Sequence, residues 1–228
     1  ANYKLLRDTA RRFGVDFYYE TNVGAGLPIV RVLKDLMMSG DRLLKIEAIR
    51  SGTISYMFNN FVAGVSFYDV VKQAQELGYT EPDPRDDLGG VDFMRKMLIL
   101  ARDAGHEIEP EDVVLGNILP ASCLAATSVA DFYEELQKSD AYFNDLRDRA
   151  TAENKVLRYI GKLADGKVFI ELEMVGADHP FYSLSGSDNI ISFTTERYKV
   201  RPLVVKGPGA GAEVTAAGVF SDLVNIGA

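Results

Sequence analysis

The sequence of 228 residues has a single cysteine, two histidines and no extended run of lysine or arginine. One cysteine, Cys123, cannot form an internal disulfide, which is typical of a reducing compartment. A net charge of −8 without a basic run disfavours a nucleic-acid partner. No apolar run approaches the roughly 20 residues that span a bilayer, and the first residues form no signal-peptide pattern. We therefore expect a cytoplasmic protein with neither a nucleic-acid partner nor a membrane partner.

Hydrophobic residues make up 47% of the sequence, which is enough to form one large domain or two small ones. Apolar periodicity and capping residues predict helices over 3–13, 66–77, 91–104, 128–138, 140–153 and 214–225, and helix starts at Pro28 and Ser51. Alternating and β-branched segments predict strands over 15–19, 43–49, 156–163, 167–175, 189–195 and 203–206. Early helices followed by a run of strands indicate the α+β class.

A loop over 79–90, with the sequence YTEPDPRDDLGG, concentrates acidic side chains between two predicted helices. Pro82 and Pro84 restrict its backbone. Because like charges repel, such a loop is costly for packing alone, and a site for a small cation such as a substrate ammonium would explain it. A solvated loop or a weak calcium site would explain it too, although the residue order of an EF-hand is absent.

Asp92 and Lys96 follow this loop and stand one helical turn apart on the same face of the predicted helix. A partly desolvated lysine beside carboxylates can act as a proton donor. An aspartate–lysine pair at this spacing is more often a surface ion pair, and the spacing alone favours that alternative.

Four segments resemble conserved blocks of the homoserine dehydrogenase family, in the family's order. They are YETNVGAGLP at 19–28, SGTISYMFN at 51–59, YTEPDPRDDLGGVDFMRK at 79–96 and GAGAEVTAAGVFSDL at 209–223. The details, including the stretch Val156 to Gly161, resemble most the dehydrogenase part of bifunctional aspartokinase–homoserine dehydrogenases. The resemblance implies an α+β fold with a mixed sheet covered by helices, without the family's N-terminal Rossmann domain. It implies a substrate-binding, catalytic and dimerisation domain over 1–206, and a closing segment over 207–228 that packs on the missing nucleotide-binding domain.

The family interconverts L-aspartate 4-semialdehyde and L-homoserine with NADPH or NADH, in threonine and methionine biosynthesis. By resemblance, Lys96 protonates the aldehyde oxygen and Asp92 is catalytic with it. The positions that resemble substrate-binding residues are Glu81, Asp87, Asp92, Gly52 and Thr53. Hydride addition creates an alkoxide, which a nearby ammonium stabilises and protonates.

The resemblance also implies two kinds of bound group besides the substrate. Gly78 and Gly211 match positions that touch the NADP or NAD cofactor. Backbone carbonyls of a glycine-rich loop match a monovalent cation site, usually filled by sodium, at Glu20, Val23, Ala25 and Leu27. A plain tight turn that needs glycine is the alternative for this loop. The segment 207–212 fits the pattern G-x-G-x-x-A, but too few residues follow it for a complete dinucleotide-binding unit.

The resemblance implies a homodimer, and it allows a tetramer in the full-length protein. We expect the chain to be a fragment that alone binds the cofactor weakly and turns over little substrate. One alternative is a non-catalytic dimerisation or amino-acid-sensing module on the same scaffold, and another is a different NAD(P)-dependent amino-acid dehydrogenase. The intact set of Glu81, Asp92 and Lys96 favours the enzyme, since a sensor would not need the lysine beside the acids.

Overall fold

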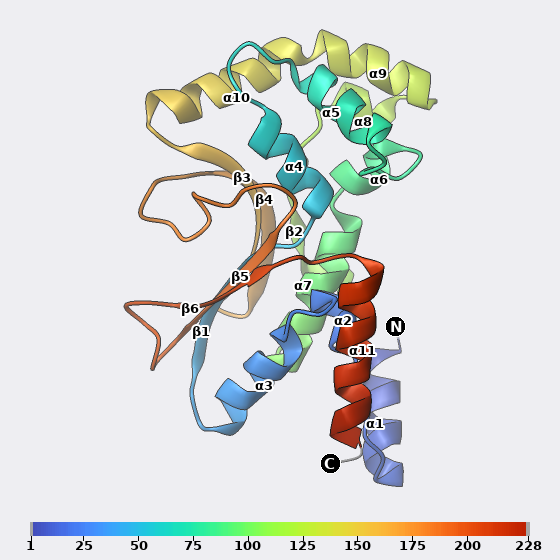
Figure 1. Cartoon of the computed structure of the whole chain (residues 1–228), viewed down its shortest axis with the longest axis vertical. Helices are drawn as coiled ribbons and strands as arrows, with labels where there is room; N and C mark the ends of the chain where they lie inside the picture. The colour runs from blue at the N-terminus through green and yellow to red at the C-terminus, as the bar shows by residue number, and fades with distance from the viewer. Residues whose placement is uncertain (1, 227–228) are drawn as a thin grey trace.

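A computed structural model describes residues 2–226, and its centre is a mixed six-stranded sheet (Figure 1). The strand order is β2-β4-β3-β1-β5-β6. The strands are β1 (Leu43–Ile49), β2 (Val114–Leu115), β3 (Val156–Ala164), β4 (Lys167–Val175), β5 (Asn189–Thr195) and β6 (Leu203–Gly207). Strand β2 runs parallel to β4, and the other neighbouring strands pair antiparallel. The predicted α+β class with a mixed sheet is confirmed.

The helices precede, interrupt and follow the sheet in the chain. They are α1 (Tyr3–Phe13), α2 (Thr21–Gly24), α3 (Ile29–Met38), α4 (Gly52–Asn60), α5 (Phe67–Glu76), α6 (Pro84–Leu88), α7 (Val91–Asp103), the 3-10 helix η1 (Pro110–Asp112), α8 (Ala121–Ala125), α9 (Val129–Lys138), α10 (Asp140–Ala152) and α11 (Ala212–Ile226). Ser51, Ser66 and Ser128 each accept a backbone hydrogen bond that caps the helix they precede. These caps set the starts of α4, α5 and α9.

Helix α7 packs directly on β3 and thereby places its own N-terminal turns beside the sheet (Figure 1). A Cβ added at Gly161 in β3 would lie 2.8 Å from the Phe93 ring and 2.9 Å from the Met97 sulfur. Ile46 and Ala48 of β1 belong to the same core and are fully buried. The glycine therefore permits a close approach of helix and strand, and this face of the sheet carries the main core.

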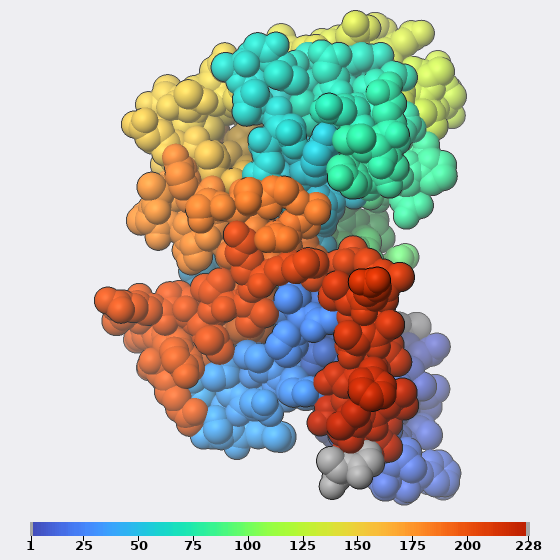
Figure 2. Space-filling view, viewed as in Figure 1, coloured from blue at the N-terminus to red at the C-terminus, as the bar shows by residue number. Residues whose placement is uncertain are grey.

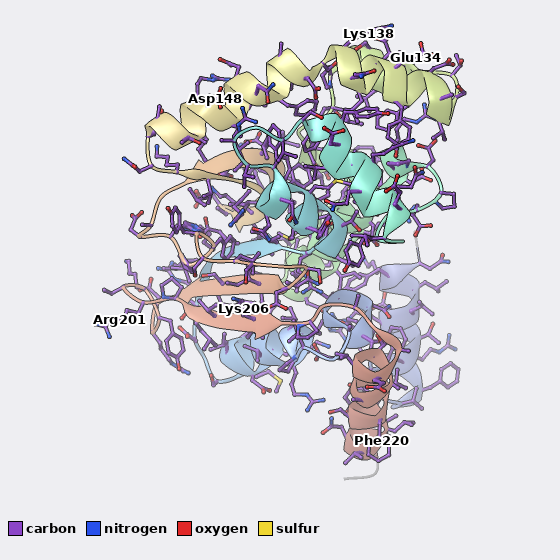
Figure 3. All side chains as sticks on the ribbon, turned by 45° about the horizontal axis from the view of Figure 1, so that its top comes forward. Glu134, Lys138, Asp148, Arg201, Lys206 and Phe220 are labelled. Carbon is purple, nitrogen blue, oxygen red and sulfur yellow. The ribbon has the colours of Figure 1, made fainter. Side chains whose placement is uncertain are left out.

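The opposite face of the sheet has a smaller apolar cluster, because neighbouring residues of a strand point to opposite sides. Ile49, Ile160 and Ile190 pack there against Phe181 and Leu184 of the segment that follows β4. Glu47 lies on this face with ion-pair partners at Lys45, Lys162 and His179. On the outside of α9 and α10, Glu134, Lys138 and Asp148 project away from the core (Figure 3), which gives these helices a polar outer face.

Three local predictions are wrong. The segment 15–19 belongs to no helix or strand and pairs with no strand within residues 2–226, so its β-prone side chains have no sheet to join. The segment 21–26 is mainly the short helix α2 and not a simple turn. The loop 79–90 contains α6, which Asp83 caps and Pro84 starts, so the residues that stiffen the loop also begin a helix. The short elements β2, η1 and α8 have no counterpart among the predictions.

Candidate active site

The candidate site begins where β1 ends and α4 starts. The Ser51 hydroxyl accepts a hydrogen bond from the Ile54 N–H at 3.1 Å and caps the helix. Gly52 lies against the segment after β4, since a Cβ there would be 3.1 Å from the Ser187 carbonyl oxygen. The Thr53 hydroxyl donates to the Tyr79 carbonyl oxygen at 2.6 Å. The first turn of α4 is thus tied to the acidic loop.

The acidic side chains of the loop divide into two roles. Asp83 caps α6 and accepts hydrogen bonds from the Arg85 guanidinium at 2.6 to 3.1 Å, so it serves the fold of the loop. The Asp87 carboxylate accepts the Glu81 N–H at 2.8 Å and also contacts the Thr53 side chain. Burial raises the pKa of the Asp87 carboxyl, although the hydrogen bond from Glu81 opposes that shift. Glu81 itself is exposed, so Asp87 and Glu81 remain available to a cationic ligand.

Lys96 and Asp92 form the ion pair that their spacing predicts. The Lys96 ammonium lies 2.7 Å from Asp92 Oδ2, and it also donates to the Arg50 carbonyl oxygen at 3.5 Å. Its side chain is 22% exposed, whereas that of Asp92 is 71% exposed. The contact with Arg50 connects α7 to the end of β1, three residues before Thr53. The lysine therefore sits beside the start of α4, a placement that a surface ion pair alone does not require.

Arg50 is the residue of this region that the sequence analysis missed. It is 1% exposed, and no guanidinium nitrogen has a hydrogen-bond partner among residues 2–226. Burial lowers its pKa to about 10, and the negative charge of Asp92 opposes that shift, so the group stays protonated at neutral pH. The signal lay in the alternation of β1, where Ile46 and Ala48 face the core and the next position on that face is a charged residue.

The two glycines matched to the cofactor lie in open surroundings. Gly78 has φ 74° and Gly211 has φ 116°, and a Cβ at either position would meet nothing within 4 Å. Such backbone is suited to the close approach of a ligand. Gly209 differs, because a Cβ there would overlap the Asn189 side chain. Strand β6, which leads into the pattern at 207–212, pairs antiparallel with β5, whereas a dinucleotide-binding unit is built on parallel strands.

The four residues matched to a cation site surround the short helix α2. The buried Glu20 carboxylate accepts the Val30 and Arg31 N–H groups at 2.7 and 2.8 Å and so caps α3. The Glu20 carbonyl oxygen already accepts hydrogen bonds within α2, and that of Leu27 accepts the Ile29 N–H. Ala25 has φ 51°, and its carbonyl oxygen lies against Gly218 of α11. Between 2 and 226, no group of three or more His, Cys, Asp or Glu side chains is arranged to hold a metal, so an ion here would depend on carbonyl oxygens.

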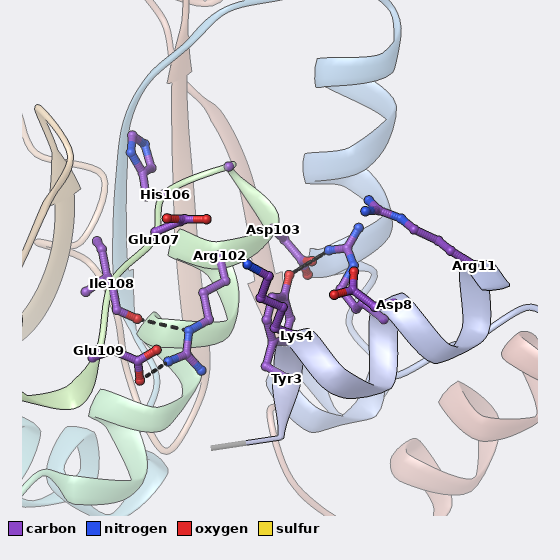
Figure 4. Close-up of a pocket in the computed structure, with 12 residues that line it drawn as sticks. Tyr3, Lys4, Asp8, Arg11, Arg102, Asp103, His106, Glu107, Ile108 and Glu109 are labelled. Atoms are coloured by element: carbon purple, nitrogen blue, oxygen red, sulfur yellow. Dashed lines mark hydrogen bonds and ion pairs between the residues drawn. The ribbon is translucent and has the colours of Figure 1, made fainter.

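A groove of about 750 Å³ lies elsewhere, between α1 and the end of α7 (Figure 4). At its base, the Asp103 carboxylate accepts hydrogen bonds from Tyr3, Tyr19 and Arg7 at 3.0, 2.6 and 2.8 Å. These contacts fix α1 to α7. None of the residues predicted for the substrate, cofactor or cation lines this groove, and the candidate active site is therefore the region around Thr53, Asp87 and Lys96.

Fold and site together define an α+β domain in which a lysine–carboxylate pair lies beside an acidic loop. The chain belongs to the homoserine dehydrogenase family, whose model matches residues 28–224. This match confirms the predicted family. As a separate observation, no helix within residues 2–226 combines the length and apolar content needed to cross a membrane.

Relatives of two kinds match the chain. The chloroplastic bifunctional aspartokinase/homoserine dehydrogenase 1 of Arabidopsis thaliana is 48% identical over 98% of this chain and 25% of its own length. The homoserine dehydrogenase of Saccharomyces cerevisiae is 47% identical over 92% of this chain and 60% of its own length. The predicted likeness to the bifunctional proteins is confirmed, and a free-standing relative matches almost as well. The chain spans less than two thirds of the length of these relatives.

Solved structures show the same fold. A protein of unknown function from Candida auris has a TM-score of 0.87 at 48% identity, over 92% of this chain and 60% of that one. The homoserine dehydrogenase of Thiobacillus denitrificans has a TM-score of 0.79 at 23% identity, over 99% of this chain and 48% of that one. At that lower identity the likeness extends to the fold alone.

Proposed function

We propose that this chain provides the substrate-binding and catalytic part of a homoserine dehydrogenase, which interconverts L-aspartate 4-semialdehyde and L-homoserine with NADPH or NADH. The observation that carries the proposal is the Lys96–Asp92 pair, held by the Arg50 carbonyl oxygen beside the start of α4. A lysine fixed in this way is oriented toward one region instead of moving freely on the surface. Family membership supplies the reaction that such a lysine would serve.

In the reductive direction, a nicotinamide cofactor, when bound, would supply the hydride that the aldehyde carbon of the substrate accepts. The Lys96 ammonium donates a proton to the aldehyde oxygen as negative charge develops there, and the product is the alcohol of homoserine. Asp92, 2.7 Å from the ammonium, holds it in place. A positioned acid of this kind accounts for about 10²- to 10⁴-fold in rate.

Glu81 and Asp87 hold the α-ammonium of the substrate, and Gly52 and Thr53 line the pocket beside them. The half-buried Asp87 supports this role, because burial disfavours its charged form and an incoming ammonium would stabilise it. Thr53 contacts both Asp87 and the Tyr79 carbonyl oxygen, and so couples the first turn of α4 to the acids.

The nucleotide-binding part lies in a separate domain, against which 207–228 packs, while 1–206 bind substrate and dimerise. Exposed apolar side chains on α1 and α11 support this packing against another domain. Leu5 and Phe13 of α1 are 65% and 69% exposed, and Phe220 of α11 is 66% exposed. Phe220 projects outward from α11, which forms a ridge at one end of the molecule (Figures 2 and 3). The extended segment 15–19, which is unpaired among the described residues, fits the edge of a sheet in that domain. Gly78 and Gly211 would approach the cofactor, and the chain alone would turn over little substrate.

A monovalent cation, sodium in this proposal, binds the carbonyl oxygens of Glu20, Val23, Ala25 and Leu27. Hard cations prefer oxygen ligands, and the unusual backbone at Ala25 turns the chain sharply there. The ion would stabilise the junction of α2, α3 and α11. The less covered face of the sheet supports a homodimer, and we assign the protein to the cytoplasm.

The test measures oxidation of homoserine and of other amino acids by the full-length protein with NADP and with NAD. We expect homoserine to be the preferred substrate. Preference for another amino acid would favour a different amino-acid dehydrogenase. A folded protein that binds the cofactor but oxidises none of them would favour a non-catalytic dimerisation or sensing module.

A further inference from the structure

Two buried arginines of this chain differ in how their charge is satisfied. Arg158 in β3 is 6% exposed, and its guanidinium donates to the carbonyl oxygens of Leu157, Phe181, Tyr182 and Leu184 at 2.9 to 3.1 Å. Arg50 is 1% exposed, and within residues 2–226 its three guanidinium nitrogens have no hydrogen-bond partner. Burying a guanidinium without partners is strongly unfavourable, so Arg158 serves the fold and Arg50 needs another explanation.

The surroundings of Arg50 contain a second unsatisfied polar group. Strands β1 and β5 pair up to Ile49 and Ile190, and Arg50 and Asn189 are the residues that come next to this last pair along the chain. Asn189 is 2% exposed, and its Oδ1 also lacks a hydrogen-bond partner in the described part of the chain. Gly209 lies against Asn189, so this polar pair sits below the loop that leads to α11.

The nearby acid does not neutralise Arg50. Asp92 is the carboxylate whose charge acts on the guanidinium, but its own contact is with the Lys96 ammonium at 2.7 Å. Arg50 directly precedes the first turn of α4, and its carbonyl oxygen accepts from Lys96. The cation with unused donors therefore belongs to a residue whose main chain adjoins both Lys96 and the first turn of α4.

We propose that the Arg50 guanidinium binds the α-carboxylate of the amino-acid substrate. This assignment rests on the proposed function, because it takes a zwitterionic amino acid as the ligand. Glu81, Asp87 and Asp92 are all anionic and can hold only the ammonium and hydroxyl groups. Lys96 is engaged at the reacting oxygen. The carboxylate then requires a separate cation, and a guanidinium binds carboxylates through two parallel hydrogen bonds.

If Arg50 binds substrate, its replacement should weaken substrate binding without lowering the stability of the fold, whereas replacement of a structural arginine should lower stability. Removing an unpaired buried charge leaves the fold unchanged or more stable. Removing Arg158 instead leaves four carbonyl oxygens without their hydrogen-bond donor. We therefore expect Arg50→Met to keep or raise Tm, and Arg158→Met to lower it. For recognition of the substrate carboxylate we expect the reverse: Arg50→Met should weaken it and Arg158→Met should not.

The experiment uses the full-length protein and compares homoserine with 3-aminopropan-1-ol, which is homoserine without its carboxylate. We expect Arg50→Met to raise the KM for homoserine about 10- to 100-fold, the loss of a charged hydrogen-bonded pair, and to leave the KM for NADP within about 2-fold. Turnover of 3-aminopropan-1-ol should be the same in Arg50→Met as in the wild type. Arg50→Lys keeps the charge without the paired donors, so its KM for homoserine should lie between those of the wild type and Arg50→Met. Arg158→Met, as matched control, should leave the KM for homoserine unchanged.

Two results would overturn the assignment while leaving the enzyme in place. One is wild-type discrimination between homoserine and 3-aminopropan-1-ol in Arg50→Met, and the other is a defect confined to the KM for NADP, which would assign the guanidinium to a cofactor phosphate. If Arg50→Met does not fold, Arg50→Lys decides the outcome. A folded Arg50→Lys variant with the intermediate KM for homoserine keeps the assignment, and any other result makes the guanidinium structural and overturns it. Absence of homoserine oxidation by the wild type would instead overturn the proposed function, and the Arg50 assignment with it.

Discussion

The Lys96 ammonium and the Asp92 carboxylate are 2.7 Å apart across one turn of α7, and the lysine is the less exposed partner, at 22% against 71%. Exposed pairs at this spacing contribute only about 0.3 to 0.5 kcal/mol. The second contact, from Lys96 to the Arg50 carbonyl oxygen at 3.5 Å, adds an anchor at the lysine end. The pair therefore does more to orient the ammonium than to stabilise the fold.

Asp87 should weaken the folded state at neutral pH, because burial raises its pKa above the ordinary 3.8. A raised carboxyl pKa means that the ionised form is disfavoured in the folded protein, so the cost is present at neutral pH and disappears as pH falls below the unfolded pKa. We expect Asp87→Asn to raise Tm by about 1 to 3 °C near pH 7, with the gain shrinking toward pH 4. Thermal denaturation as a function of pH measures this.

Asp83 provides the matched control for that prediction, since it lies four residues earlier in the same loop. Hydrogen bonds from Arg85 lower the pKa of its carboxyl, so its charge stabilises the folded state. Asp83→Asn should lower Tm at neutral pH. Equal losses of Tm in both variants would contradict the assignment of different roles to the two acids.

Glu47, on the outer face of the sheet, should control part of the acid stability. Burial would raise its pKa, but the polar side chains of His179 at 3.6 Å and Lys45 at 2.7 Å overcome that effect and hold the pKa at about 2 instead of the ordinary 4.5. A lowered carboxyl pKa stabilises the folded state above the unfolded value, and this stability is lost as pH falls from 4.5 toward 2. Glu47→Gln should therefore lower Tm at pH 7 and flatten its decline below pH 4.5. Glu153→Gln, which removes an exposed ion pair with Lys155, is the control and should change Tm by no more than about 1 °C at pH 7 or below pH 4.5. An effect as large as that of Glu47→Gln would argue against a special role for the ion pairs of Glu47.

The proposed cation should be visible as stabilisation by mass action. An ion that binds only the folded state at 100 times its Kd contributes about 2.7 kcal/mol. We expect the full-length protein to melt several degrees higher in sodium chloride than in choline chloride at the same ionic strength, since choline cannot fit between the carbonyl oxygens of Glu20, Val23, Ala25 and Leu27. Equal Tm values in the two salts would leave the loop as a turn without an ion.

Most elements could be predicted from the sequence, because their signals are local. The bounds of β1, β4 and β5 match the prediction, and β3 and β6 match within a residue. The Ser66 and Ser128 caps likewise mark the starts of α5 and α9. Strand β2 has two residues and depends on pairing with β4, so no periodicity could reveal it. The segment 15–19 has strand-forming side chains, but strand formation needs a partner, which local sequence does not supply.

The candidate site was only partly accessible to sequence reasoning. Asp92 and Lys96 could be paired from helical spacing, and the order of the family blocks singled out Thr53 and Asp87. The contact of Thr53 with Tyr79 crosses 26 positions of the chain and follows from the packing of α4 beside the loop. The isolation of the Arg50 guanidinium depends on the register of β1 and β5, which no local pattern fixes.

The most direct test of the central claim follows homoserine-dependent reduction of NADP by the full-length protein and by its Lys96→Met variant. Lys138→Met is the matched control, since Lys138 forms a similar ion pair with Glu135 on α9, away from the site. We predict that Lys96→Met loses about 10²- to 10⁴-fold in kcat while it still binds NADP and keeps its Tm, and that Lys138→Met keeps full activity. Activity retained in Lys96→Met would contradict its role as proton donor and reduce the Asp92–Lys96 pair to a surface ion pair.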